Sequence, residues 1–362
     1  MSDFVHLHIH SHYSLLDGLP KIAELVARCG EYQMTALALT DHGNLYGAIE
    51  FYQKAKKSGI KPIIGCEMYI AAGRMQDKNP GVDDKRYHLT VLAASNEGYQ
   101  NLIALVSQAH LKGFYYKPRV DKELLRNHAS GLIALSGCFS GEIGRALQYK
   151  KPDTAERLIH EYQDIFGKEN FYLEVQPHLS FENQRAINEG LFTLAPRVGA
   201  KLVATNDIHY ATSEDADAQD ILVSVQTGNR IQDEDRLTMK GSDLSLRSAA
   251  EMAALFPHNP EVISNTQEIA ERVNIDIELG KNQLPRFAVP PGYDANSYLT
   301  ELCHQGCKRR FGSEVNQNPL INERLNYELR VINQTGFASY FLIVQDFIAW
   351  ARQHNIVVGP GR

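Results

Sequence analysis

The chain has 362 residues, a hydrophobic content of 43%, a charged content of 22% and a net charge of −6. This composition is typical of a soluble globular protein, and the length suits a barrel-sized domain together with a smaller one. The sequence has neither an apolar run long enough to cross a membrane nor the pattern of a secretory signal. The acidic balance argues against a stand-alone nucleic-acid clamp, which is usually basic, but it is compatible with a local basic path.

The first predicted element, residues 5–10, alternates between imidazole and aliphatic side chains. A β-strand sends successive side chains to opposite faces, so His6, His8 and His10 would share one face. Neutral imidazole is the commonest metal ligand among side chains, and two of them at i and i+2 can reach one ion. The alternative is a surface strand with exposed histidines, although a solvated face rarely repeats one residue type in this way.

Strand and helix patterns alternate over about the first 210 residues. Further strands are predicted at 36–40, 61–70, 87–93, 131–136, 171–174 and 201–205. Helices are predicted at 19–30, 47–58, 98–110, 153–166 and 181–198. This alternation predicts an α/β fold with a parallel sheet, and seven such units favour a distorted, seven-stranded TIM-like (β/α) barrel.

A domain boundary is predicted near residue 275, where prolines and glycines interrupt the pattern between 275 and 291. We expect one domain over 1–275 and a mainly helical segment over 276–362, with helices at 296–311, 322–334 and 339–354. The chain ends on Gly359-Pro360-Gly361-Arg362, which suggests a piece of a longer polypeptide.

Five scattered cysteines favour free thiols in a reducing cytosol over a disulfide framework, and hence a cytoplasmic protein. Cys303 and Cys307 lie four residues apart on a predicted helix. A zinc pair is possible there, but no second cysteine or histidine pair lies nearby, which favours packing.

Residue types that bind metals recur at the ends of the predicted strands. They are His8, His10, Asp17, Asp41, His42, Glu67, His88, Cys138, Glu174, His178, Asp207 and His209. Strand ends of an α/β barrel converge on one mouth, where active sites form. Asp41 or Asp207 alone could cap a helix, and His88 alone could be a core histidine, but their recurrence predicts a site for several metal ions.

The pattern His8-x-His10, Asp17-Gly18, Asp41-His42-Gly43, Glu67, His88, Cys138 and Asp207-x-His209 resembles the polymerase and histidinol phosphatase (PHP) domain. Three longer motifs resemble the family of α subunits of bacterial replicative DNA polymerase III. These motifs are Tyr13-Ser14-Leu15-Leu16-Asp17-Gly18, Ser136-Gly137-Cys138-x-Ser140-Gly141-Glu142 and Gly336-Phe337-Ala338-Ser339-Tyr340-Phe341-Leu342-Ile343-Val344. The resemblance covers the whole chain. It implies a PHP domain followed by the first part of the polymerase palm, without the polymerase carboxylates.

The resemblance also implies a nine-ligand site for three divalent metals. His8, His10, Glu67 and Asp207 would hold one ion. Glu67 would bridge to a second ion, held also by His88 and Cys138. Asp17, His42 and His209 would hold the third. Cys138 stands where stand-alone PHP phosphatases usually have histidine, and its thiolate favours zinc, with manganese or iron as alternatives.

Clustered divalent ions suit phosphoester hydrolysis, and the resemblance implies 3′–5′ proofreading exonuclease activity, with Asp17, Glu67 and Asp207 as catalytic residues. DNA synthesis would belong to the parent polymerase. The partners implied are a DNA primer-template or single-stranded 3′ end, the remaining polymerase domains, and a separate exonuclease subunit and sliding clamp. One alternative is a non-catalytic metal-bearing scaffold that docks such an exonuclease. Another is a stand-alone histidinol-phosphatase-type enzyme, which the residues after 275 disfavour.

A basic and aromatic segment, residues 110–119, has the composition of a path for single-stranded nucleic acid. Lys112, Tyr116, Lys117 and Arg119 are its candidate DNA contacts, and Arg362 is a further one. The alternative is a tyrosine-rich loop that packs on the barrel.

Overall fold

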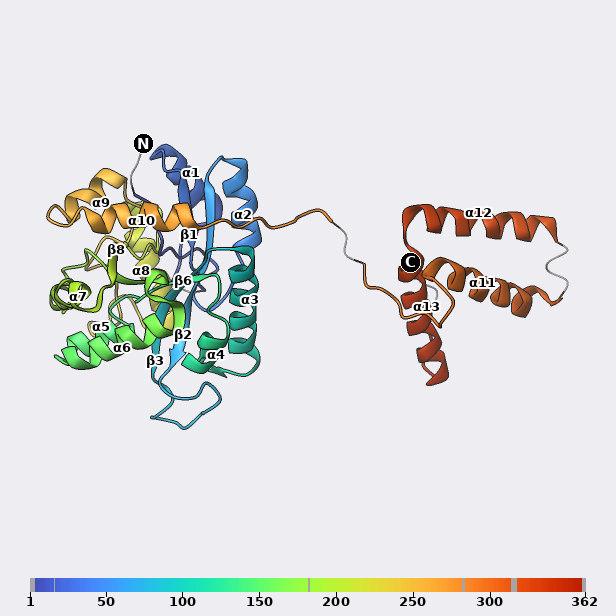
Figure 1. The fold of residues 1–362 in the computed structure, drawn as a ribbon, viewed down its shortest axis with the longest axis horizontal. Coiled ribbons are helices and arrows are strands. Elements are labelled where there is room, and N and C mark those ends of the chain that lie inside the picture. Colours follow the sequence, from blue (N-terminus) through green and yellow to red (C-terminus); the bar gives the residue numbers. More distant parts are fainter. Residues whose placement is uncertain (1–3, 16, 182, 282–283, 314–317, 360–362) are drawn as a thin grey trace. The chain divides into compact units, whose positions relative to one another are not determined.

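The computed structural model describes residues 4–15, 17–181, 183–281, 284–313 and 318–359. The chain divides into two compact units, Met1–Ile277 and Glu278–Arg362 (Figure 1). No helix of the described part is long and apolar enough to cross a membrane.

The first unit is a curved mixed sheet surrounded by helices. Its strands are β1 (Ala36–Leu39), β2 (Lys61–Ala71), β3 (Arg86–Ala93), β4 (Phe114–Tyr115), β5 (Lys117–Val120), β6 (Leu132–Leu135), β7 (Phe171–Val175) and β8 (Lys201–Ala204). Its α-helices are α1 (Ile22–Glu31), α2 (Ala48–Lys57), α3 (Asn96–Leu111), α4 (Lys122–Asn127), α5 (Glu142–Gln148), α6 (Pro152–Phe166), α7 (Gln184–Val198), α8 (Ala216–Thr227), α9 (Ala249–Leu255) and α10 (Glu261–Arg272). Two short 3₁₀ helices, η1 (Lys168–Asn170) and η2 (Ser213–Asp215), complete the described elements of this unit.

The strands and helices form where the sequence pattern requires burial. β1, β6 and β7 are buried at every position, as expected for strands covered on both faces. Helix α1 buries Ile22, Leu25, Val26 and Cys29, whose spacing places them on one side of the helix. Helices α1 and α2 pack on β1, α3 packs on β3, and α7 and α10 pack on β8.

The N-terminal segment closes the sheet, but not as the regular strand that the alternation predicts. The amide of Ala38 donates to His6 O at 3.0 Å and that of Thr40 donates to Ile9 O at 2.9 Å. On its other side, His10 N donates to Ile208 O and Ile208 N donates to His8 O. Residues 5–10 therefore lie between β1 and the chain after β8, and only an isolated bridge from Ile9 to Ile208 is regular. This closure places seven extended segments around the barrel.

The expectation of a wholly parallel sheet is wrong at β3. This strand is antiparallel to β2 on one side and to β6 on the other, whereas β1–β2, β6–β7 and β7–β8 are parallel. Alternating sequence patterns predict that a strand exists but carry no information on its direction. The reversal has a direct effect on the site, because the start of β3 lies where the parallel strands end.

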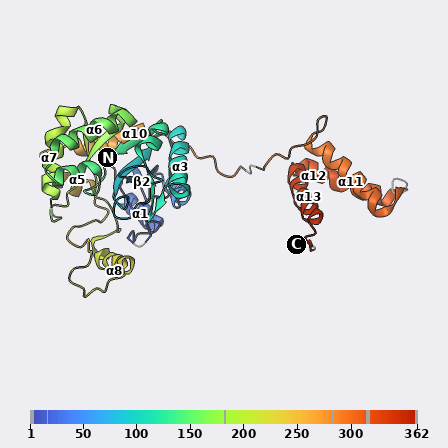
Figure 2. The same cartoon turned by 90° about the horizontal axis from the view of Figure 1, so that it is seen from below.

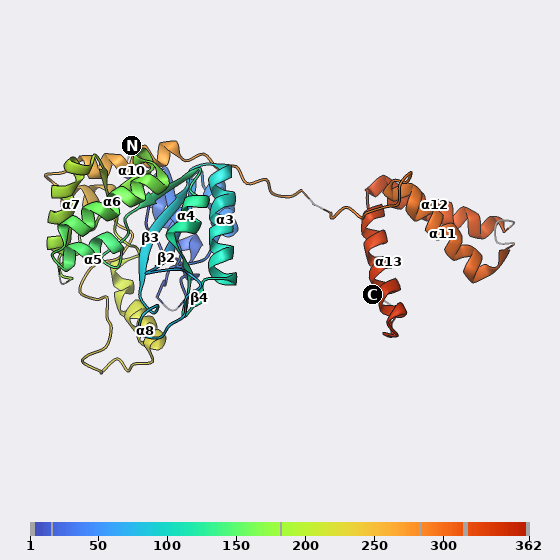
Figure 3. The same ribbon diagram turned by 60° about the horizontal axis from the view of Figure 1, so that its bottom comes forward.

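A short hairpin extends the end of β2. β5 pairs in parallel with Tyr69 and Ile70 of β2, and β4 pairs with β5. Figure 3 shows this hairpin and α8 at the same end of the unit, where the β2–β3 hairpin also projects.

The second unit consists of three helices, α11 (Ala295–Phe311), α12 (Pro319–Thr335) and α13 (Ala338–Gln353), in its described part. Asp294 caps α11 by accepting from Ser297 N at 2.7 Å, and Asn318 caps α12 in the same way. Among the described residues of this unit, Leu299, Ala338 and Leu342 are buried. Cys303 packs against this small cluster, in agreement with the packing interpretation of this cysteine.

Candidate metal centre

The barrel brings all nine predicted ligands into one group at the mouth of the first unit. His8 and His10 come from the N-terminal segment, Asp17 from the following turn, and His42 from the end of β1. Glu67 lies within β2 at the level of His42, with which it forms a β-bridge. His88 lies at the start of β3 and joins the group only because β3 is antiparallel, and its neighbour across the pair is Tyr69. Cys138 follows β6, and Asp207 and His209 follow β8.

Glu67 lies at the centre of the group. Its Oε1 is 2.7 Å from His88 Nδ1 and 3.4 Å from His8 Nε2, and its Oε2 is 2.6 Å from His42 Nδ1 and 3.6 Å from His10 Nε2. Burial acts to raise the pKa of this carboxyl, but His88, His42 and His8 outweigh burial and hold the pKa well below its ordinary value. Glu67 is therefore an anion that faces four imidazoles.

Asp207 forms the second junction. Its Oδ1 lies 3.3 Å from His8 Nε2, 3.2 Å from His10 Nε2 and 3.6 Å from His209 Nδ1. Burial again acts to raise the carboxyl pKa, and His8 and His209 lower it below its ordinary range. Asp207 has a φ of 48°, a left-handed conformation that aspartate tolerates better than most residues.

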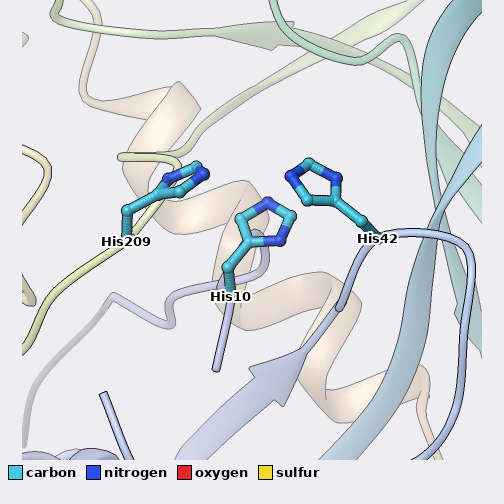
Figure 4. Close-up of side chains that lie close together, drawn as sticks. All are labelled: His10, His42 and His209. Carbon is cyan, nitrogen blue, oxygen red and sulfur yellow. The ribbon is translucent and has the colours of Figure 1, made fainter. Parts of the chain in front are cut away.

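Three histidines complete the arrangement around Asp17. His10, His42 and His209 come from three separate segments, and their rings lie together (Figure 4). The centroid of the His10 ring is 4.1 Å from that of His42 and 4.4 Å from that of His209. His42 Nε2 lies 3.2 Å from Asp17 Oδ2. Gln219 and Gln226 of α8 donate to the carbonyl and carboxylate of Asp17, so α8 holds the turn in place (Figure 2).

Buried ligand atoms without hydrogen-bond partners support a metal centre. In the part of the chain that the structure describes, these atoms include His8 Nε2, His10 Nε2, His42 Nδ1, Asp17 Oδ1, Glu67 Oε2 and Asp207 Oδ1. His42 Nδ1 and Glu67 Oε2 are close in space but lack hydrogen-bond geometry. Buried polar atoms without partners are costly, so a group of them facing one another calls for a ligand.

The spacing of these atoms also fits a metal. Two donors bound tetrahedrally to one ion at about 2.0–2.2 Å lie about 3.3–3.6 Å apart. The contacts of Asp207 with His8 and His10 are close to this size, and in three groups the ligand atoms all lie within 4.8 Å of one another. These groups are His8, His10 and Asp207; His42, Glu67 and His88; and His10, His42 and His209. The donor set therefore fits divalent ions.

Cys138 lies at the edge of the group. Its Sγ is 3.8 Å from His88 Nδ1 and 4.0 Å from Glu67 Oε1. Burial, and then the negative charges of Glu67 and Asp207, raise the pKa of this thiol well above its ordinary value. A divalent cation would reverse this effect, because a coordinating thiol loses its proton.

Hydrogen bonds from neighbouring side chains orient the ligand histidines. His8 Nδ1 lies 2.7 Å from Glu174 Oε1, and His10 Nδ1 lies 2.9 Å from the Ser14 hydroxyl. Ser14 donates in turn to Asp41 at 2.7 Å. These contacts aim the Nε2 atoms of both histidines into the centre, as in carboxylate–histidine–metal arrangements. The sequence marks Glu174 and Asp41 as polar residues near strand ends, but that they contact His8 and Ser14 depends on which residues lie opposite them.

Other histidines near the barrel have structural contacts. His6 Nε2 lies 2.8 Å from Arg247 O, so only two of the three alternating histidines belong to the centre. His178 contacts Ser242 and Asn206 O through its two ring nitrogens.

The candidate DNA contacts are not equivalent. Lys112 and Tyr116 are exposed, and Lys117 Nζ lies 5.6 Å from the centre of the Tyr69 ring, which itself stacks against His42. Arg362 lies outside the described residues. The prediction for Arg119 is wrong. This side chain is 1% exposed, and its guanidinium donates to the carbonyls of Gly113, Met75, Asp77 and Asp83. It has no free donor face for a phosphate and instead fastens the β2–β3 loop to β5.

Comparison with known proteins agrees with this arrangement. Residues 6–178 match the PHP domain model, and residues 297–362 match the model of the bacterial DNA polymerase III alpha NTPase domain. The chain is 44% identical to DNA polymerase III subunit alpha of Treponema pallidum over 99% of its own length and 30% of the relative's. It is 38% identical to that of Thermus aquaticus over 99% of its length and 34% of the relative's.

Solved structures give weaker likenesses. An amidohydrolase from Chromobacterium violaceum aligns at 18% identity and a TM-score of 0.38, covering 57% of this chain and 87% of that one. A two-domain protein from Bacteroides vulgatus, containing a predicted PHP-like metal-dependent phosphoesterase, aligns at 17% identity and a TM-score of 0.35, covering 73% and 62%. The PHP domain model and the sequence relatives carry the assignment: the chain, which spans about a third of the length of these relatives, belongs to the family of bacterial DNA polymerase III α subunits and contains a PHP domain.

Proposed function

We propose that the first unit is a metal-dependent phosphoesterase that removes nucleotides from DNA 3′ ends, within a protein that synthesises DNA. The observation that carries the proposal is the buried group of histidine, aspartate and glutamate side chains whose unpartnered ligand atoms face one another. The nine residues would hold three divalent ions, with zinc favoured by Cys138 and manganese or iron as alternatives. When bound, such ions would supply Lewis acidity and would lower the pKa of water for attack on phosphorus.

The residues of the chain have distinct roles in this proposal. Glu67 would bridge two ions, because each of its carboxylate oxygens faces a different set of imidazoles. Asp207 would hold an ion together with the buried His8 and His10, whereas Asp17 would hold one beside the partly exposed His42. His88 has a side chain that is 21% exposed, and Asp17 and His42 are also partly exposed, so a phosphodiester can approach from this side. A purely structural metal centre is usually closed, and the open side therefore favours catalysis over the scaffold alternative.

The test uses the chain loaded with metal and a single-stranded oligonucleotide labelled at its 5′ end. We expect stepwise shortening from the 3′ end. Asp17→Asn and Asp207→Asn should each reduce the rate by at least about 100-fold. Loss of a residue that only hydrogen-bonds a metal ligand typically costs about 10–100-fold, and loss of the ligand itself should cost more. Asp164→Asn on α6 is the matched control, since this exposed residue lies outside the group.

Elemental analysis of the same samples separates the alternatives. If the parent chain holds metal and its unfolding temperature falls with a chelator, but no preparation shortens DNA, the site is a scaffold. A content of less than one ion per chain after purification with metal present would show that the chain has no such metal centre. Wild-type rates in both aspartate variants would show that the assigned residues are wrong.

The basic and aromatic hairpin is proposed as one part of the DNA path. Lys112 and Tyr116 remain candidates because they are exposed, and Lys117 because it is only half-buried and lies over the Tyr69 ring. Replacing Lys112 and Lys117 by alanine should flatten the dependence of log affinity on log salt by roughly 0.7 per lost phosphate contact. An unchanged salt dependence would show that the hairpin does not contact DNA phosphates and only packs on the barrel.

A further inference from the structure

A cleft of about 620 Å³ opens beside the metal centre. Its walls are the start of β3, residues 140–149 around α5, and the start of α6. Helices α5 and α6 pack side by side along this part of the sheet (Figures 1 and 3). His88 belongs to both the cleft wall and the ligand group, since its Nδ1 lies 2.7 Å from Glu67. The cleft therefore adjoins the candidate metal centre at His88.

The lining of this cleft is cationic, although the chain as a whole has a net charge of −6. Lys85, Arg86, Arg145 and Lys151 line it, together with the carboxylates of Asp84 and Glu142. Lys85, Arg145 and Lys151 are exposed and form no ion pair with any residue that the structure describes. Such free cations in one concave surface raise the local concentration of anions.

The two carboxylates of the cleft are already engaged. Glu142 pairs with Lys122 at 2.9 Å and accepts from the Tyr162 hydroxyl at 2.6 Å. Asp84 accepts from Gly81 N at 2.8 Å. Lys122 thus neutralises Glu142, whereas Asp84 keeps its negative charge, and the cations that line the cleft still outnumber this one carboxylate.

Aromatic and hydroxyl groups accompany the cations. Tyr149 is 63% exposed at the end of α5, and Tyr87 and Thr154 also line the cleft. Cations that contact phosphates, interleaved with rings that can stack on bases, are the features of a groove for single-stranded nucleic acid.

We propose that this cleft binds the phosphate backbone of the strand whose terminal phosphodiester reaches the metal centre at His88. The inference deepens the proposed function and rests on it for the identity of the strand as DNA. The hairpin with Lys117 flanks β2 on one edge and β3 flanks it on the other. The cleft is therefore a separate surface from the hairpin and includes none of its residues.

The test compares two triple variants with equal changes in charge. The cleft variant replaces Lys85, Arg145 and Lys151 with alanine. The control variant replaces Lys57, Arg126 and Lys168, which are exposed, have no ion pair among the described residues and do not line the cleft. Binding of a fluorescent, phosphorothioate-protected single strand to the metal-loaded chain is measured by anisotropy over a range of salt.

We expect the cleft variant to bind at least tenfold more weakly at low salt and its salt slope to fall by roughly 2, which is about 0.7 for each of three lost contacts. The control variant should bind as the parent does. Metal content and unfolding temperature should match the parent in both variants, which shows that a loss of binding is not a loss of fold. A salt slope in the cleft variant equal to that of the parent would overturn the proposal.

Hydrolysis and binding, measured together, separate the two proposals. If the parent shortens DNA and the cleft variant binds as tightly as the parent, the exonuclease function is supported and the proposal that the cleft binds the strand is wrong. If no preparation shortens DNA but only the cleft variant loses binding, the cleft binds nucleic acid and the exonuclease function is wrong.

Discussion

The two units of the chain bury their apolar side chains to very different degrees. The first has one continuous core that includes the β-strands, the inner faces of the helices and the aliphatic residues Val5, Leu7 and Ile9. In the described part of the second, the buried residues are Leu299, Ala338 and Leu342. Phe347 and Trp350 on α13 are 65% and 56% exposed. Local signals such as the caps at Asp294 and Asn318 are thus enough to define helices, whereas a stable core requires contacts from distant segments.

The difference has a thermodynamic consequence. Burial of apolar surface is the main favourable term in folding, and each unit must offset the conformational entropy of its own chain. We therefore expect the first unit to unfold cooperatively at a higher temperature than the second. The predictions below test this contrast, from the largest expected effect to the smallest.

Removal of metal should have the largest effect, and only on the first unit. Without ions, the carboxylates and imidazoles of the centre remain buried with unpartnered atoms. We expect a chelator to destabilise this unit by more than about 5 kcal/mol, because the free energy of metal binding adds to that of folding. Glu67→Gln should lose more than one ion per chain. Differential scanning calorimetry and elemental analysis measure both effects, and an unchanged first-unit transition after chelation would contradict them.

Truncation of a buried leucine should distinguish the two cores. Leu342→Ala removes one of the few fully buried side chains of the second unit, and Leu37→Ala is the matched change in β1. Each should cost about 2–5 kcal/mol. In the second unit this cost should abolish the fold, whereas the first should remain folded with a lower unfolding temperature. Hydrogen exchange followed by mass spectrometry reports on each unit in the whole chain. Retained protection of α11 and α13 in Leu342→Ala would show that the second unit is more stable than its burial suggests.

Cysteine reactivity should report the same contrast without altering stability. Burial raises the pKa of Cys29 to about 12 and also raises the pKa of Cys66, so both thiols stay protonated and covered at pH 8. Cys303 and Cys307 are only partly buried. Iodoacetamide should modify these two at least about tenfold faster than Cys29 and Cys66, because the thiolate is the reactive form. Equal rates, read by peptide mass spectrometry, would mean that the first unit opens as readily as the second.

Much of the fold follows from periodicity, and the rest depends on pairing between distant segments. The pattern predicts helix 47–58 and strand 61–70, and the structure has α2 at Ala48–Lys57 and β2 at Lys61–Ala71. The boundary expected after residue 275 lies close to the division after Ile277. The direction of β3 and the irregular backbone of residues 5–10 could not be predicted, because both depend on which strands lie alongside.

The candidate site shows the same limit at the level of single residues. The alternation at His8 and His10 predicts ligands, and the structure places both histidines against Asp207. Arg119 fits a DNA path by composition, yet its guanidinium is satisfied by four carbonyls that come mainly from a loop some 40 residues earlier in the sequence. A sequence window cannot distinguish a buried arginine from an exposed one when its partners are this distant.

The reversed strand β3 has a consequence for how this family can vary. Because β2 and β3 form a hairpin, the chain between Ala71 and Arg86 supplies Asp84 and Lys85 to the cleft that His88 of the centre also lines. Between Asp77 and Asp83, whose carbonyls Arg119 binds, this connection can change in length without shifting the register of either strand, since loops tolerate insertions that strands do not. The metal ligands and the loop beside the cleft are thus encoded in separate stretches of sequence. Natural or engineered insertions in this loop can change substrate access to the metal centre while the ligands stay the same.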